Sequence, residues 1–175
     1  MKCKYTVAIF AAAAWGAAAA ASPPTYLYAG QWGTMGSGEG EFQFPTGVAV
    51  APGGTVYVVD QGNNRVQYFT AVGSFLGAWG RSGSGDGEFA NASGVARASN
   101  GYLYVTDGFN HRVQYFTAAG SFVGKWGAEG GGDGQFRYPE GVAVGANGYF
   151  YVADALNNRI QYFTAAGSFV GKWGS

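Results

Sequence analysis

Three residue types that can carry chemistry return together at one fixed interval along the chain. Each of three stretches has an aspartate, an asparagine three residues later and an arginine two residues after that, and the set recurs every 47 residues. The aspartates and arginines are Asp60, Arg65, Asp107, Arg112, Asp154 and Arg159. A carboxylate beside an amide and a guanidinium could bind a ligand, so these residues are the first candidates for a binding site.

The strict recurrence of these groups also has a structural explanation. A carboxylate or amide at a turn accepts backbone N–H bonds, and an adjacent arginine can pair with it. Catalytic residues break internal symmetry, whereas these obey it in every unit. The pattern therefore favours a role in holding the corners of a repeated unit over a role in catalysis.

The repeated unit itself contains four strand-like runs. In the first unit they are Gly47–Val50, Val56–Asp60, Arg65–Phe69 and Phe75–Trp79. The runs are rich in Val, Tyr and Phe, are too short for helices, and are separated by Gly and Asn turn signals. A four-stranded meander repeated at a fixed interval is the blade of a β-propeller. We therefore predict an all-β chain of three antiparallel four-stranded blades, at about residues 42–80, 89–127 and 136–174. A lone outer strand is expected at 26–33.

The repeated pattern resembles the NHL repeat. In the first unit the motif is carried by Gly38, Glu39, Gly40, Phe42, Pro45, Gly47–Val50, Gly54, Tyr57, Val58, Asp60, Asn63, Arg65, Val66, Gln67 and Phe69. It recurs at the same spacing in the other two units, and the resemblance covers about residues 26–175. It implies propeller blades and contact with proteins through the face that bears the loops.

Three blades are half of the six that NHL propellers usually have. Each blade hides one sheet face against the next, so an open arc leaves two apolar faces bare, with on the order of 10 kcal/mol of burial at stake. We therefore expect a head-to-tail homodimer that closes a six-bladed ring, with a truncated gene product as the alternative. The segments 26–32 and 169–173 would compete for one outer-strand position, where one of them adds a fifth strand or stays loose.

Two residues depart from the repeat and are further candidates for binding. Arg97 replaces the valine of Val50 and Val144 on the innermost strand, where it either projects a charge into the central channel or extends to water at the strand end. His111, the single histidine, replaces the asparagine found in the other two units. A lone exposed turn histidine is more often incidental than a ligand.

Residues 1–21 have the pattern of a secretory signal peptide. Lys2 and Lys4 precede an uncharged apolar run, and small alanines precede Ser22. An uncleaved membrane anchor is the alternative, although the apolar run is at the short limit for a span. Residues 22–25 form a short linker. We expect a secreted or cell-envelope protein without membrane contact apart from the leader, and cleavage would remove Cys3, the single cysteine.

Composition excludes one class of partner. Only 11% of the residues are charged, and the formal net charge is zero. Without the two leader lysines, eight basic residues face ten acidic ones, so the chain lacks the basic footprint of a nucleic-acid binder. The carboxylates fall in the turns between the second and third strands and in the long connections between blades, while the opposite turns carry no charge. This distribution predicts one mildly acidic recognition face, unless the charges merely cap turns.

The sequence thus favours a binding or scaffold module over an enzyme. One histidine cannot fill a multi-histidine zinc shell, and no P-loop or Ser-His-Asp pattern is present. We expect no cofactor and no metal, although the acidic glycine-rich loops around Glu39, Asp86 and Asp133 leave cation binding as an alternative. The expected partner is a protein or peptide, basic or on a cell surface. The competing hypothesis is a lyase or hydrolase whose site forms near Arg97 and His111 on oligomerisation.

Overall fold

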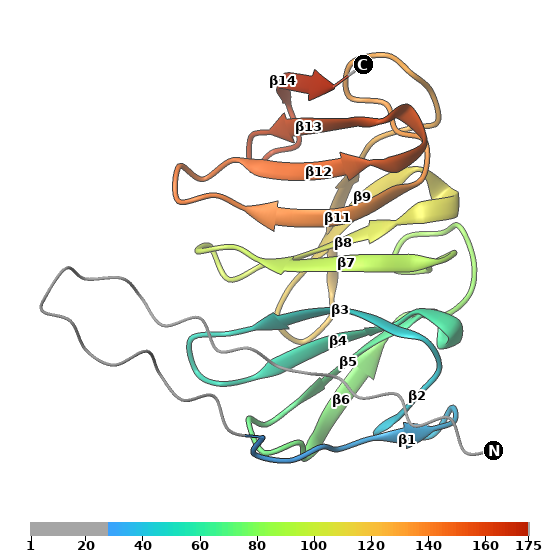
Figure 1. The fold of residues 1–175 in the computed structure, drawn as a ribbon, viewed down its shortest axis with the longest axis vertical. Helices are drawn as coiled ribbons and strands as arrows, with labels where there is room; N and C mark the ends of the chain where they lie inside the picture. Colours follow the sequence, from blue (N-terminus) through green and yellow to red (C-terminus); the bar gives the residue numbers. More distant parts are fainter. Residues whose placement is uncertain (1–27, 175) are drawn as a thin grey trace, which may run out of the picture.

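The computed structural model describes residues 28–174, which form three four-stranded antiparallel sheets (Figure 1). Blade 1 consists of β3 (Pro45–Val50), β4 (Val56–Asp60), β5 (Arg65–Phe69) and β6 (Phe75–Trp79). Blade 2 consists of β7 (Ala92–Arg97), β8 (Leu103–Asp107), β9 (Arg112–Phe116) and β10 (Phe122–Trp126). Blade 3 consists of β11 (Pro139–Val144), β12 (Phe150–Asp154), β13 (Arg159–Phe163) and β14 (Phe169–Gly174). Within each sheet the strands pair in sequence order.

Short elements connect these strands. In each blade a 3-10 turn joins the second strand to the third: η1 (Gln61–Asn63), η2 (Gly108–Asn110) and η3 (Ala155–Asn157). Before blade 1, β1 (Thr34–Met35) and β2 (Glu41–Phe42) form a short parallel pair. We call the end of the blades that carries the three 3-10 turns the turn face.

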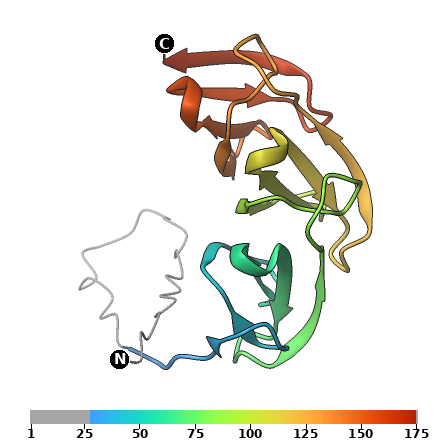
Figure 2. The same cartoon turned by 90° about the vertical axis from the view of Figure 1, so that its right-hand side faces the viewer.

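The three sheets fan in an arc, with β3, β7 and β11 side by side on the inner edge (Figures 1 and 2). Glycine permits this close approach of the inner strands. A Cβ at Gly47 would lie 2.9 Å from the backbone nitrogen of Val95, and a Cβ at Gly94 would lie 2.9 Å from that of Val142. Any larger side chain at these two glycines would force neighbouring blades apart.

Two apolar clusters fill the spaces between neighbouring blades. Between blades 1 and 2, the buried residues include Val59, Val66, Val95 and Phe116. Between blades 2 and 3, they include Tyr104, Val113, Trp126, Phe150 and Phe163. A third cluster, on the far side of blade 1, consists of Phe42, Val56, Val58 and Phe69, with Trp32 packed against it. The core therefore lies between the sheets, as radial stacking of blades requires.

The predicted all-β fold of propeller blades is confirmed, and β4, β5 and β6 have the predicted bounds. The prediction of a strand at 26–33 is wrong for the described part of that range, because residues 28–33 contain no strand. An outer strand needs a third strand with a free edge, and in the described residues β5, β9 and β13 are already paired with β6, β10 and β14. The leader, the linker 22–25 and residues 26 and 27 lie outside the described residues. Within residues 28–174, no helix has the length and apolar character needed to cross a membrane.

Candidate functional site

The repeated aspartates lie at the blade corners, where the second strand ends. In blade 2, the Asp107 side chain is fully buried and its Oδ2 accepts hydrogen bonds from Arg112 Nε (2.8 Å), Asn110 Nδ2 (2.9 Å) and Gln114 Nε2 (3.1 Å). Its Oδ1 accepts the backbone N–H of Ala90 at 2.8 Å. A buried carboxylate is tolerated only with such compensation, and this one has a full set of donors.

The donors around this aspartate also hold the long connection between blades. The guanidinium of Arg112 donates to the carbonyl oxygens of Ser84, Gly85 and Glu88 at 2.8 to 3.0 Å, and Gln114 Nε2 donates to that of Glu88 at 2.7 Å. The glycine-rich connection is thereby tied to the end of its own blade. The corner network is what gives the long loops of the turn face a fixed conformation.

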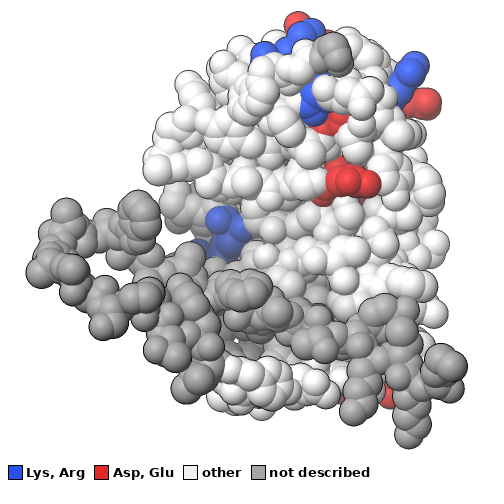
Figure 3. Space-filling model, viewed as in Figure 1, with Lys and Arg blue, Asp and Glu red and all other residues white. Residues whose placement is uncertain are grey.

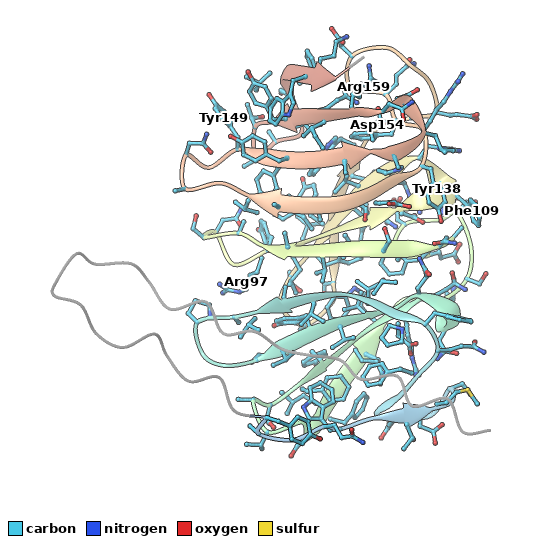
Figure 4. All side chains as sticks on the ribbon, in the orientation of Figure 1. Arg97, Phe109, Tyr138, Tyr149, Asp154 and Arg159 are labelled. Carbon is cyan, nitrogen blue, oxygen red and sulfur yellow. The ribbon has the colours of Figure 1, made fainter. Side chains whose placement is uncertain are left out.

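The same network recurs in the other two blades. Asp60 accepts Arg65 Nε at 2.7 Å and Asp154 accepts Arg159 Nε at 2.7 Å, and both carboxylates are fully buried. Figure 4 shows the third of these pairs between β12 and β13. The structure therefore places the six repeated residues predicted as binding residues inside the blade corners, where their charged atoms bond within the chain. The carboxylates of the three aspartates are buried and bond to groups of the chain itself.

His111 also has a partner within the fold. It occupies the left-handed region (φ 53°) at the end of η2, and its Nδ1 accepts the backbone N–H of Tyr138 from blade 3 at 3.1 Å. Asn64, its counterpart in blade 1, accepts the backbone N–H of Asn91 from blade 2 at 3.2 Å. The histidine therefore makes the same hydrogen bond between neighbouring blades that the asparagine makes in blade 1.

Arg97 lies at the end of β7 opposite the turn face (Figure 4). It is half-buried beside Tyr57 of blade 1, and its Nε is buried without a hydrogen-bond partner in the described structure. Burial raises the pKa of the Tyr57 phenol, and the nearby Arg97 charge partly offsets this rise. The five residues of β8 separate Arg97 from η2 and His111, a distance of about 16 Å along the strand. The enzyme hypothesis requires Arg97 and His111 to lie near one site. The structure instead places them at opposite ends of blade 2.

Most charged side chains near the turn face form ion pairs with one another. Besides the three corner pairs, Arg81 pairs with Glu88, and the lysines of two outer strands reach back to the loops. These pairs are Lys125–Asp86 and Lys172–Asp133. Two of the three acidic loop residues considered for cation binding are therefore paired, and residues 28–174 contain no group of three or more His, Cys, Asp or Glu that could hold a metal ion.

The charged side chains that form no ion pair in the described residues are mainly acidic. In the described residues, no ion pair involves Glu39, Glu41, Glu129, Glu140, Arg97 or Arg137. Figure 3 shows the inner-strand side of the molecule as largely uncharged, with one small basic group left of the centre and acidic and basic groups together toward the top and right. The predicted acidic face is thus reduced to a few exposed glutamates with one arginine, Arg137, among them.

Apolar side chains are the more prominent feature of the turn face. Phe109 in η2 is 62% exposed and Leu156 in η3 is 67% exposed, and their counterpart in blade 1 is Gly62. Tyr138 packs against Phe109, with ring centroids 5.3 Å apart, and the two rings lie together at the right-hand edge of Figure 4. Phe44, the counterpart of Tyr138, is 59% exposed. These four residues are the turn-face apolar residues.

Two of these residues adopt an unfavourable backbone conformation. Phe44 and Tyr138 lie in the left-handed region, with φ of 50° and 59°. Asn91, their counterpart in blade 2, has φ of 61° and is a residue type that tolerates this region. A bulky side chain there costs about 1 to 2 kcal/mol, and such strain is concentrated at functional sites. Burial, and secondarily the negative charge of Glu140, raises the pKa of the Tyr138 phenol, so this ring is uncharged at neutral pH.

The sequence interpretation missed the turn-face apolar residues. Their signal was a departure from the repeat, since positions 62, 109 and 156 read Gly, Phe and Leu, and positions 44, 91 and 138 read Phe, Asn and Tyr. Charged departures such as Arg97 were predicted as binding residues, whereas apolar departures were not. Exposure could not be predicted, because an aromatic residue in a turn is as easily buried under a neighbouring blade.

Comparison with protein families identifies the repeat. The NHL repeat family matches residues 42–69 and 136–163, which start at the Phe before the inner strand and end with the third strand of blades 1 and 3. A comparison with curated proteins found no match. The resemblance to the NHL repeat is thus confirmed at two of the three units.

Solved structures with the same fold include two enzymes and a nidogen/laminin complex. A streptogramin B lyase has a TM-score of 0.59 at 16% identity, over 74% of this chain and 40% of the lyase. Hydrazine synthase from Kuenenia stuttgartiensis has a TM-score of 0.59 at 15% identity, over 75% of this chain and 36% of that one. A nidogen/laminin complex has a TM-score of 0.57 at 16% identity, over 74% of this chain and 47% of the other. The chain spans less than half the length of these proteins, and identities this low establish a shared fold alone.

Proposed function

We propose that this NHL-repeat chain, built of β-propeller blades, is a secreted binding or scaffold module that recognises a protein or peptide through its turn face. The observation that carries the proposal is the pair of adjacent rings at the junction of blades 2 and 3. Phe109 is mostly exposed, and Tyr138 is held against it in a strained backbone conformation. A folded chain gains no stability from exposing an aromatic ring, so contact with a partner is the best explanation for it.

The surroundings of the rings favour a ligand with both apolar and basic groups. Glu140 at the start of β11 is exposed, makes no ion pair in the described residues, and its negative charge acts on the Tyr138 phenol. An aromatic pair beside an unpaired carboxylate suits an apolar side chain flanked by lysine or arginine. The rigid corner networks support this role, because loops fixed in advance lose little entropy on binding. The signal peptide expected at residues 1–21 supports an extracellular or cell-envelope location.

The alternative is a lyase- or hydrolase-type activity at the mouth of the channel. The lyase and the hydrazine synthase among the similar structures share the fold, and the separation of Arg97 from His111 speaks against a site built from both. Metal analysis of the purified protein tests this alternative. Stoichiometric zinc would favour an enzyme, whereas its absence would leave the binding proposal as the simpler explanation.

A phage-displayed library of random peptides, selected on the purified full chain, tests the binding proposal. We expect enrichment of peptides that combine aromatic or aliphatic residues with lysine or arginine. Phe109→Ala should weaken binding of the selected peptides by at least about tenfold, the loss expected from truncating an interface anchor. Val72→Ala is the matched control, since Val72 is 84% exposed but lies in the turn at the opposite end of blade 1.

Two outcomes would contradict the proposal. One is a selection that enriches no peptides of this kind. The other is equal binding of selected peptides to the wild-type chain, to Phe109→Ala and to Val72→Ala, which would move the recognition surface elsewhere. Far-ultraviolet circular dichroism and urea midpoints would confirm that both variants are folded.

A further inference from the structure

The face of the blade 3 sheet that points away from blade 2 is apolar, and no other part of the described chain covers it. It carries Tyr151, Ile160, Tyr162 and Trp173, and we call it the trailing face. In blade 2 the tyrosine equivalent to Tyr151 is 1% exposed, and the tryptophan equivalent to Trp173 is 9% exposed, because blade 3 covers them. Trp173 is 53% exposed. The two internal junctions thus show how this face is covered when a next blade is present.

The trailing face already has the geometry of a completed junction. Trp173 packs on Tyr151 and Tyr162 with centroid distances of 5.8 and 5.7 Å. The equivalent group in blade 2 has distances of 5.6 and 6.0 Å, and the Phe150 ring of blade 3 seals it at 4.0 Å from Tyr104. The trailing face therefore has the same shape and chemistry as the covered face of blade 2.

The inner-strand glycines give independent evidence. Gly47 and Gly94 have no room for a Cβ, because the backbone of the next blade lies against them. Gly141, the third member of the series, meets only the Cβ of Ala153 at 3.7 Å, an ordinary contact within its own blade. A glycine at this position is needed only where another inner strand approaches.

The complementary surface is present on blade 1. Its leading face carries Phe42, Val56, Val58 and Phe69, all 6% exposed or less, with Trp32 packed against them. This face is therefore covered in the single chain, and of the two faces expected to be bare only the trailing face is exposed. The counterparts of these four residues in blade 2 are Phe89, Leu103, Val105 and Phe116, which cover the trailing side of blade 1. The leading face of blade 1 is therefore of the kind that covers a trailing face.

We propose that the trailing face of blade 3 binds the leading face of blade 1 of a second copy of this chain, and that two such junctions close a six-bladed ring. Two copies of the three described blades make six, which lies within the range of known propellers, typically about four to eight blades. The inference does not rest on the ligand proposed for the turn face.

The turn face supports the same pairing. At the junction of blades 2 and 3, Tyr138 packs on Phe109. Across the closing junction, the residues at the equivalent positions are Phe44 of one copy and Leu156 of the other. Both are apolar and more than half exposed in the single chain. The closing junction thus brings together two apolar side chains, while the equivalent pair between blades 1 and 2 is Gly62 with Asn91.

Closure of the ring requires Trp173 of a second copy to replace Trp32 on blade 1. Trp32 lies with its ring centroid 4.5 Å from that of Phe69 and packs over Gly73. Trp79 and Trp126 occupy the equivalent places on blades 2 and 3, over Gly120 and Gly167. Trp173 of a second copy needs the place that Trp32 holds on blade 1. Residues 28–33 form no strand, so their displacement breaks no sheet pairing.

Light scattering coupled to gel filtration, and sedimentation equilibrium over a dilution series, test the pairing on the full chain as purified. We expect twice the chain mass for the wild type. Gly141→Ala should give the mass of one chain with an unchanged urea midpoint at the lowest concentration, because the added methyl group clashes only with a second copy. Gly53→Ala is the matched control, since nothing lies within 4 Å of its Cβ position, and it should keep the doubled mass.

Three results would overturn the proposal: a wild-type chain of single mass at every concentration, a mass of three or more chains, or a Gly141→Ala variant that associates like the wild type. A compact single-mass chain would mean that another segment or partner covers the trailing face. None of these results bears on peptide binding by Phe109, so failure of the ring and failure of the proposed function are distinguishable.

Two tryptophan variants test the exchange. Trp173→Ala should raise the dissociation constant of the dimer by at least about 30-fold, as expected for a central aromatic anchor. Trp32→Ala should lower it, because the place on blade 1 is then vacant. Weakening of the dimer by both variants would overturn the exchange of Trp32 for Trp173.

Discussion

The blade corners and the turn-face apolar residues lie only a few residues apart along the chain, yet they follow opposite rules. The corners repeat the same aspartate, arginine and glutamine in all three blades, with the aspartates fully buried. The turn-face positions differ from blade to blade, and three of the four turn-face apolar residues are more than half exposed. Repetition marks the groups that hold the fold, and departure from it marks the groups that face a partner.

His111 shows why departure from the repeat is not sufficient. It differs from its counterparts, yet its Nδ1 makes the hydrogen bond between blades that Asn64 makes one unit earlier. Asn91, the counterpart of Tyr138, accepts a hydrogen bond from Gln61 of blade 1, and Tyr138 makes a ring contact with Phe109 in place of such a bond. A residue that differs from the repeat is therefore a functional candidate only when its side chain does not make the contact that its counterpart makes in another blade.

The largest effect should come from breaking a corner. Asp107→Ala removes the partner of the buried Arg112 and of three further donors, and it should lower the free energy of unfolding by about 3 to 5 kcal/mol. Urea unfolding followed by tryptophan fluorescence measures the loss. Asp86→Ala, which breaks the exposed pair with Lys125, is the control and should cost less than about 1 kcal/mol. Similar losses in both variants would refute the structural role of the corner.

A smaller effect is expected at the link between blades 2 and 3. His111→Ala leaves the Tyr138 N–H without an acceptor and puts alanine in the left-handed region, so unfolding should become easier by about 2 kcal/mol. His111→Asn restores the arrangement of Asn64 and should stay within about 0.5 kcal/mol of the wild type. A large loss for both variants would show that the imidazole has a role that asparagine cannot fill.

Tyr138→Asn should separate stability from recognition. Asparagine tolerates the left-handed backbone, as Asn91 does in blade 2, and the relief of strain offsets the lost contact with Phe109. The free energy of unfolding should change by less than about 1 kcal/mol, while affinity for selected peptides should fall by about tenfold. Calorimetric titration and urea unfolding give the two numbers, and unchanged affinity would remove Tyr138 from the recognition surface.

The smallest effect concerns acid stability. The backbone N–H of Gly85, with Arg81 second, lowers the pKa of the Glu88 carboxyl below its ordinary value of 4.5. A lowered folded pKa adds stability above the unfolded pKa, and that stability is lost as the pH falls through the folded value. Glu88→Gln should therefore flatten the acid side of the stability profile and leave neutral stability nearly unchanged. Gln135 supports this expectation, since its Oε1 accepts the equivalent bond from Gly132 at 2.9 Å.

The sequence determined the units and their internal pairing. The 47-residue interval, the Gly and Asn turns and the Val, Tyr and Phe runs fix four antiparallel strands per blade, because these signals act between neighbours in the chain. The corner role of Asp60 and Arg65 was also accessible, since a charge that recurs in every unit serves the unit. The sequence matched the strand bounds of blade 1 except for β3, which begins at Pro45 rather than Gly47.

Only the tertiary structure decided what covers each face. The sequence of residues 26–33 matches an outer strand, but each third strand in the described residues is already paired with its own outer strand. Residues 28–33 contribute Trp32 to blade 1 instead. The place of Arg97 far from His111, the exposure of Phe109 and the open space at Gly141 likewise depend on the neighbouring blade. Backbone pairing is local and can be read from spacing, whereas burial is a relation between surfaces that meet only when the blades fan around their common edge.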